Sequence, residues 1–142
     1  MSRIATISAA LALSLTLGAG GDTVTFTGGG NIAVATAAKF DDHEVTIEDF
    51  NTAQDTMDLT GRTLASQNLI DGAVDGAATL FAALEAAAGA MNAGTTAAQF
   101  VYGGDLYIYI ENGGFGTVDA GDGYIKLAGV SETLTEGVNL IV

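Results

Sequence analysis

Alternation of apolar and polar residues with a period of two is the main pattern along this chain. Every second residue from Leu11 to Leu17 is leucine, which places these leucines on one face of an extended segment. Short runs rich in β-branched and aromatic residues mark further strands, and glycine-rich runs separate them. The strands predicted in this way lie at 11–17, 23–26, 32–34, 45–50, 56–59, 100–102, 106–110 and 124–127.

One segment has helical spacing instead. The alanine-rich residues 74–91 place Leu80, Leu84 and Ala88 on one face, and Gly94 follows the segment. We therefore predict a mainly β fold, a short β-roll-like or β-sandwich-like domain with one Ala-rich helix at about 74–91. The predicted parts of this single domain, 1–142, are a glycine-turn, β-roll-like part at 1–40 and a β-rich C-terminal part at 41–142.

The charge balance narrows the classes of partner. There are 17 acidic residues against 4 Lys and Arg, and the net charge is −13. Such a surface repels phosphate backbones, so we expect no nucleic-acid partner. In one interpretation, the excess of acidic residues only keeps the protein soluble. In the other, divalent cations hold some of the carboxylates together, and Ca²⁺ suits irregular loops because it accepts six to eight oxygen ligands.

Two absent residue types support the second interpretation. The chain has no cysteine, which excludes disulfides, thiolate zinc sites and a cysteine nucleophile. It also has no proline, whereas it has 20 glycines. A small extracellular domain without disulfides needs another source of stability, and a bound metal ion can supply it.

The first 18 residues have two interpretations. Arg3 followed by an apolar stretch and small residues is typical of a signal peptide, and a small periplasmic protein would then result. Thr6, Ser8, Ser14 and Thr16 interrupt the stretch, which favours a folded β segment. The stretch is too short and too hydroxylated for a membrane span.

The most informative motif is the glycine-rich turn at 17–25. Gly18 and Gly20 precede Asp22, and an apolar residue, Val24, follows it two positions later. Nine residues further on, Gly29 and Asn31 repeat the turn in weaker form. This pattern resembles the nonapeptide repeat of RTX (haemolysin-type calcium-binding) proteins, a parallel β-roll whose turns bind Ca²⁺. In the alternative interpretation, both runs are ordinary hairpin turns.

Later segments extend this resemblance. The strand 45–50 and the strand 56–59 resemble the two strands that follow the β-roll in RTX proteins, and the strands of 100–130 resemble the closing ones. Type I exported RTX proteins carry an uncleaved C-terminal signal, an acidic residue before a few apolar ones. The residues that resemble it here are Glu136, Val138, Leu140, Ile141 and Val142. A plain edge strand is the alternative.

A second metal candidate is the loop at 111–122. Asp119 and Asp122 lie on a glycine-rich loop between two strands, an arrangement that suits Ca²⁺ but not the EF-hand spacing. A solvated turn is the alternative. His43 is the only histidine, so the acidic run 41–44 is a poor zinc site.

These features predict a non-enzymatic role. No nucleophile elbow and no His-Glu-x-x-His zinc motif is present. We expect a secreted, calcium-binding structural protein, extracellular or at the cell surface. It would assemble with its own copies through strand edges that include the apolar N-terminal segment and Tyr102, Tyr107 and Tyr109. An adhesin or carbohydrate-binding module that contacts a cell-surface glycan through these tyrosines is the alternative.

Overall fold

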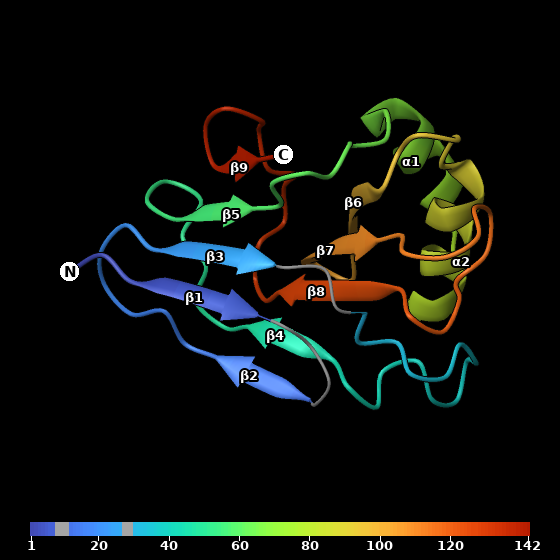
Figure 1. The fold of residues 1–142 in the computed structure, drawn as a ribbon, viewed down its shortest axis with the longest axis horizontal. Helices are drawn as coiled ribbons and strands as arrows, with labels where there is room; N and C mark the ends of the chain where they lie inside the picture. The colour runs from blue at the N-terminus through green and yellow to red at the C-terminus, as the bar shows by residue number, and fades with distance from the viewer. Residues whose placement is uncertain (8–11, 27–29) are drawn as a thin grey trace.

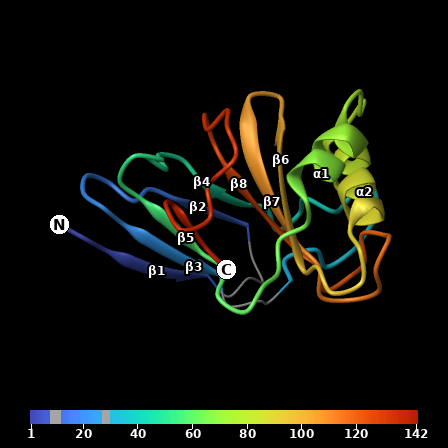
Figure 2. The same ribbon diagram turned by 90° about the horizontal axis from the view of Figure 1, so that it is seen from above.

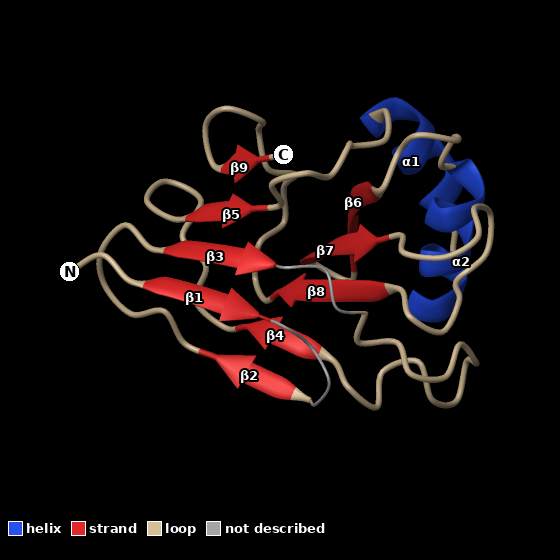
Figure 3. Cartoon of the chain, in the orientation of Figure 1, coloured by secondary structure: helices blue, strands red, loops and turns tan. Residues whose placement is uncertain are grey.

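The computed structural model describes residues 1–7, 12–26 and 30–142, and contains two sheets and two helices within these ranges (Figures 1 and 3). The strands are β1 (Ile4–Ile7), β2 (Leu13–Leu15), β3 (Thr23–Phe26), β4 (Val45–Ile47), β5 (Thr56–Asp58), β6 (Ala97–Tyr102), β7 (Asp105–Ile110), β8 (Gly123–Leu127) and β9 (Leu140–Ile141). The helices are α1 (Gln67–Val74) and α2 (Leu80–Ala90).

Successive strands alternate between the two sheets. One sheet has the order β1-β3-β5-β9, with every pair parallel. In the other sheet, of order β2-β4-β8-β7-β6, the first three strands are parallel. The chain therefore winds as a coil from one sheet to the other and back, and the segment between β5 and β8 interrupts the winding.

That interrupting segment contains both helices and a hairpin. β6 and β7 pair antiparallel, and β7 continues antiparallel onto β8. Gly103 and Gly104 form the turn between β6 and β7 with φ of 62° and 90°, a region that favours glycine. The fold is thus mixed α/β, with two sheets and two helices, and the prediction of a mainly β domain is only partly confirmed.

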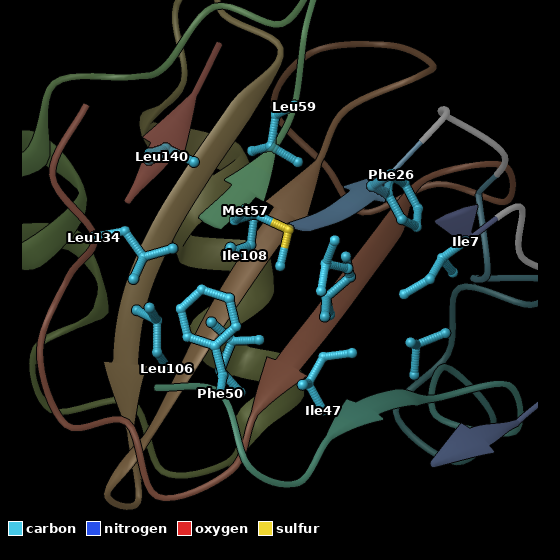
Figure 4. Close-up of a cluster of buried hydrophobic side chains, with 14 of the residues drawn as sticks. Ile7, Phe26, Ile47, Phe50, Met57, Leu59, Leu106, Ile108, Leu134 and Leu140 are labelled. Carbon is cyan, nitrogen blue, oxygen red and sulfur yellow. The ribbon is translucent and has the colours of Figure 1, made fainter. Parts of the chain in front are cut away.

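The main core lies between the two sheets. Alternate residues of the strands point inward, so Val24 and Val45 are fully buried. Ile47 and Met57 are fully buried in the same core (Figure 4). The sequence pattern of period two is the local origin of this core. Ile108 and Ile125 extend it across β7 and β8.

A second core lies under the helices. Figure 2 shows α1 and α2 beside β6 and β7, on the side away from the first sheet. Leu84 and Phe100 are fully buried there, with Tyr109 and Tyr124. Within the described residues, no helix is long and apolar enough to cross a membrane.

The single helix predicted at 74–91 is two helices. α1 begins seven residues before the predicted start, and α2 begins only at Leu80. Gly76, with φ of 77°, breaks the helix between them. Thr79 then starts α2 as its N-cap, because its hydroxyl oxygen accepts a hydrogen bond from the Ala82 N–H at 3.1 Å.

Most predicted strands are present, and two segments differ. Residues 32–34 form no strand: the Ile32 N–H donates to the Asp122 carbonyl, and the Ile32 carbonyl accepts from the Gly121 N–H. Ile32 therefore joins the loop before β8 rather than a sheet. β1, inside the segment predicted to be β-structured, had no strand pattern of its own in the sequence. Of the strand predicted at 11–17, β2 covers the centre, and Leu11 lies outside the described residues.

Candidate metal centre

The turn from 18 to 22 leads from the second sheet into β3. Gly18 has φ of 90° and Gly20 has φ of 125°, values that L side chains rarely adopt. A Cβ at Gly20 would also lie 2.7 Å from the Met1 carbonyl oxygen. Both backbone conformation and space therefore require glycine at position 20.

Asp22 ends this turn directly before β3, and its side chain is 1% exposed. Its Oδ1 accepts a hydrogen bond from the Arg3 N–H at 2.6 Å. Its Oδ2 is buried and has no hydrogen-bond partner among the residues that the structure describes. An unpartnered carboxylate oxygen in the interior is costly, because nothing replaces the water that it lost.

Asp55 occupies the equivalent position on the next turn of the coil. It directly precedes β5, and its Oδ1 accepts the Asp22 N–H at 2.9 Å. Its Oδ2 accepts the Asn51 N–H, four residues earlier, at 2.8 Å. The residue four positions before Asp22 is Gly18, whose N–H donates to Asp49 Oδ2 instead, at 2.9 Å. Asp22 Oδ2 therefore lacks a hydrogen-bond donor equivalent to the Asn51 N–H, which donates to Asp55 Oδ2.

Main-chain oxygens approach the same turn. The Gln54 carbonyl oxygen would lie 3.0 Å from a Cβ on Gly21, and the Met1 carbonyl approaches Gly20. Ca²⁺ accepts carboxylate and main-chain carbonyl oxygens together. Among the described residues, no group of three or more acidic or histidine side chains could hold a metal ion. The oxygens of this turn are therefore Asp22 Oδ2 and the main-chain carbonyls beside Gly20 and Gly21. Oxygen ligands of these kinds suit Ca²⁺ better than zinc.

Asp49 stabilises the same turn without a metal. Its two oxygens accept the Leu17 and Gly18 N–H groups at 2.7 and 2.9 Å. These hydrogen bonds hold the pKa of Asp49 below its usual value, with a smaller contribution from the positive charge of Arg3. Sequence reasoning did not find Asp49, because its partners lie about thirty residues away along the chain.

The second predicted site is organised by Asp122, which is fully buried. Its Oδ1 accepts the Asn112 N–H at 2.8 Å. Its Oδ2 accepts the Tyr109 hydroxyl at 2.7 Å and the Asp119 N–H at 2.6 Å. The side chain of Asp119 is half-buried, and its Oδ2 accepts the Thr117 hydroxyl at 3.4 Å. Both oxygens of Asp122 are thus already bonded, which makes this loop a weaker candidate for a cation than the turn at Asp22.

Glu111 belongs to this cluster and was not among the predicted ligands. It is 3% exposed, and its Oε2 lies 3.3 Å from the Tyr109 hydroxyl. Burial and the nearby Asp122 carboxylate raise the pKa of Glu111, and burial also raises that of Tyr109. The sequence carried one signal for Glu111, an acidic residue directly after an apolar strand.

The remaining predicted ligands lie elsewhere. Asn31 is buried, and its carboxamide accepts the Tyr124 N–H and donates to the carbonyls of His43 and Tyr124. This carboxamide therefore joins the segment after β3 to β8. Gly29 lies outside the described residues. The structure thus does not bring Asn31 to the turn at Asp22.

The predicted export signal lies around β9. Leu140 is buried against Met57 of β5, and Ile141 pairs with Asp58. Glu136 and Val138 lie in the exposed turn that precedes β9. Val142 packs against the edge of the main core. The C-terminal residues are therefore part of the first sheet in the folded protein.

The tyrosines differ from their expected role at exposed edges. β7 lies between β6 and β8, so Tyr107 and Tyr109 are on an internal strand, and both are buried. The rings of Phe100 and Tyr107 stack with centroids 5.8 Å apart. Only Tyr102 is half-exposed, in an open hollow that Asp71, Asp75 and Glu132 also line. The single ring of Tyr102 offers little surface on which a glycan could stack.

No protein-family model matches the sequence, and no curated protein matches it. The RTX resemblance therefore depends on the residues of the chain itself. The feature that best supports a functional site is Asp22, a buried acid with one free oxygen on a turn that requires glycine.

Proposed function

We propose that this chain is a calcium-stabilised structural module of the β-roll type, acting outside the cell and without catalytic activity. The observation that carries the proposal is the buried, unpartnered Oδ2 of Asp22 beside a glycine turn and main-chain oxygens. A Ca²⁺ ion there would replace the missing hydrogen-bond donor and neutralise part of the charge. The ion supplies stability rather than chemistry.

The winding of the chain supports the β-roll part of the proposal. Parallel strands that alternate between two sheets are the arrangement of a roll. Ile4 of β1 pairs with Thr23 of β3, so one turn of the coil takes 19 residues. This is close to two nine-residue repeats, about 18 residues, in the nonapeptide pattern. The following turn is longer, because Thr23 pairs with Thr56.

Calcium would make folding depend on whether the chain is inside or outside the cell. Where calcium is scarce, the −13 net charge and the orphan carboxylate oppose the compact state, so the chain stays loose during export. Where calcium is plentiful, binding to the folded form alone adds stability, about 2.7 kcal/mol at 100 times the dissociation constant. Glu136 and the apolar residues after it are the proposed export signal. The folded copies would then assemble with one another, which is the structural role that we propose for the chain.

Thermal unfolding in three solutions tests the calcium site. We expect the melting temperature to be higher in millimolar Ca²⁺ than in chelator or in an equal concentration of Mg²⁺, because Mg²⁺ demands stricter geometry and keeps its waters. Equal melting temperatures in calcium and chelator would refute the proposal. Equal gains with both cations would mean that charge screening, not a site, is responsible.

Asp22→Asn and Asp55→Asn are a matched pair for locating the ion. Asp55 has a donor on each oxygen, whereas Asp22 has one donor only. We expect Asp22→Asn to abolish most of the calcium-dependent gain. Asp55→Asn should lower stability to the same extent in calcium and in chelator. A full calcium response in Asp22→Asn would place the ion elsewhere.

A further inference from the structure

β1 and β2 are the last strands of their sheets at the same end of the coil. Each is paired on one side only, β1 with β3 and β2 with β4. In the part of the chain that the structure describes, no strand lies on the other side of either one. Figure 1 shows both strands along one border of the molecule, and the helices lie away from it. We refer to this border, β1 with β2, as the open end.

The opposite edges of the two sheets are covered. The outer side of β6 bonds to the segment 63–67: the Ala65 N–H donates to the Ala97 carbonyl, and the Gln67 side chain donates to the Gln99 carbonyl. The outer side of β9 meets the turn before it, where the Gly137 N–H donates to the Leu140 carbonyl. Covering of this kind prevents edge-to-edge association. Among the described residues, no segment covers the open end in this way.

The core is incomplete at the open end. Leu13 shares its register with Val45 and Ile125, so its side chain points into the same interior. Val45 and Ile125 are 0% exposed, whereas Leu13 is 44% exposed. The difference arises because no described strand lies beyond β2. Another strand beside β2 would bury Leu13 as its neighbours are buried.

The strands of the open end have unpaired main-chain groups. The Thr23 N–H donates to the Arg3 carbonyl, so in this parallel ladder Ile4 and Thr6 direct their N–H and C=O groups away from β3. Neither β1 nor β2 contains a charged residue or proline, the usual protection of such edges. These strands can therefore accept a partner strand.

The distribution of charge favours a second copy as that partner. The first 21 residues contain one charged side chain, Arg3, so all 17 acidic residues lie after them. Two chains of net charge −13 repel each other over most of their surfaces. An exposed acid, Glu48, does reach this end, where its carboxylate accepts a hydrogen bond from the Ser14 hydroxyl of β2 at 2.8 Å. This end is where two copies meet with the least repulsion.

We propose that two copies dock head to head through the open end, β1 against β1 and β2 against β2. A two-fold axis perpendicular to the sheets extends both sheets from one copy into the other, with antiparallel pairing at each junction. Both Leu13 side chains then become buried. This inference deepens the proposed structural role by naming its assembly surface. It does not depend on where calcium binds.

Sedimentation velocity over a range of concentrations tests the dimer, in calcium and in chelator. We expect the wild type to shift from monomer to dimer as its concentration rises. Leu13→Lys places a charge at the open core, and Thr6→Pro removes an outward N–H without removing a bond to β3. Each should weaken the dimer about tenfold or more. Val138→Lys, at an apolar site 74% exposed near β9, is the control and should leave the dimer unchanged.

Cross-linking gives an independent measure. The chain has no cysteine, so Thr6→Cys creates a single reactive site. A short bis-maleimide should join two Thr6→Cys chains and should not join two Val138→Cys chains. Circular dichroism confirms that each variant is folded.

Three outcomes would overturn the inference: a wild type that stays monomeric at every concentration, a dimer that both Leu13→Lys and Thr6→Pro leave intact, or equal cross-linking at the two cysteines. A folded monomer that calcium still stabilises would refute the head-to-head dimer and leave the calcium site standing.

Discussion

At the scale of single residues, the group around Tyr109 is the least ordinary feature of the interior. The Tyr109 hydroxyl has one proton, and two buried carboxyl groups, Asp122 and Glu111, lie within 2.7 and 3.3 Å of its oxygen. The hydroxyl donates its shorter hydrogen bond to the Asp122 carboxylate. Burial is the main reason that the pKa of Glu111 is raised, and the charge of Asp122 beside it adds to the effect.

Replacement of Glu111 by glutamine should therefore stabilise the protein at neutral pH. A carboxyl whose pKa is raised on folding stabilises the native state only while it is protonated, below the ordinary value of 4.5, and this contribution is lost as the pH rises. We expect the melting temperature of Glu111→Gln at pH 7 to exceed that of the wild type by a few degrees, and the difference to vanish near pH 4.

Asp105→Asn is the control for Glu111→Gln, because the pKa of Asp105 is lowered on folding and the expected change in melting temperature has the opposite sign. Asp105 accepts the Gly129 N–H and pairs with Lys126 at 3.2 Å, and the hydrogen bond from Gly129 is the main reason that its pKa is lowered from 3.8. Such a group stabilises the fold above its ordinary pKa and loses this effect as the pH falls. Asp105→Asn should thus lower the melting temperature at pH 7. A lower melting temperature for Glu111→Gln as well would contradict our account of the cluster.

At the scale of secondary structure, the two helices begin in different ways. Thr79 accepts the Ala82 N–H and caps α2, whereas Ser66 at the start of α1 has no side-chain cap hydrogen bond. α2 also carries the alanines that lie flat against the second sheet, since Ala83, Ala87 and Ala88 are fully buried. The start of α2 therefore affects the packing of the whole helical layer.

The two caps can be compared directly. We expect Thr79→Ala to lower the free energy of unfolding by about 1 kcal/mol, the usual contribution of an N-cap hydroxyl. Ser66→Ala removes no hydrogen bond from a helix start and should change it much less. Urea unfolding at constant pH measures both values. Equal effects would mean that the Thr79 hydroxyl contributes nothing as a cap.

At the scale of the whole molecule, repulsion among carboxylates opposes folding. The described residues contain one ion pair, Lys126 with Asp105, so most of the 17 acids have no basic partner. A compact chain of net charge −13 stores this repulsion, and an unfolded chain relieves it. Dissolved salt and bound calcium should both reduce the repulsion, by different means.

Salt should therefore stabilise the metal-free protein. We expect the melting temperature in chelator to rise as NaCl increases from about 0.01 M to 0.15 M, because the screening length falls from about 30 to 8 Å. Millimolar calcium adds little ionic strength, so its effect should persist on top of 0.15 M NaCl if it binds at Asp22. A melting temperature that does not change with NaCl would argue against stored repulsion.

The local pattern predicted much of the secondary structure and part of the site. The β-branched and aromatic residues of 23–26 located β3, and the strand predicted at 124–127 is β8 (Gly123–Leu127), because the preference of such residues for extended backbone is a local property. The glycines at 18 and 20 also indicated a turn in the sequence, and the structure shows why glycine is needed there, since few other residues adopt these φ values. The break near Gly76 was missed, because the alanine-rich sequence that follows it, 77–90, strongly favours helix.

The sequence by itself thus determined most of the strands, their inward faces, the glycine turns and the excess of negative charge. Tertiary structure alone decided which strands are neighbours, which carboxylate oxygen lacks a donor and which end of the coil stays open. The Gly18 N–H bonds to Asp49 and not to Asp22, and Leu13 is exposed although Val45 in the same register is not. These outcomes depend on contacts between residues about thirty positions apart, and no local period encodes such contacts.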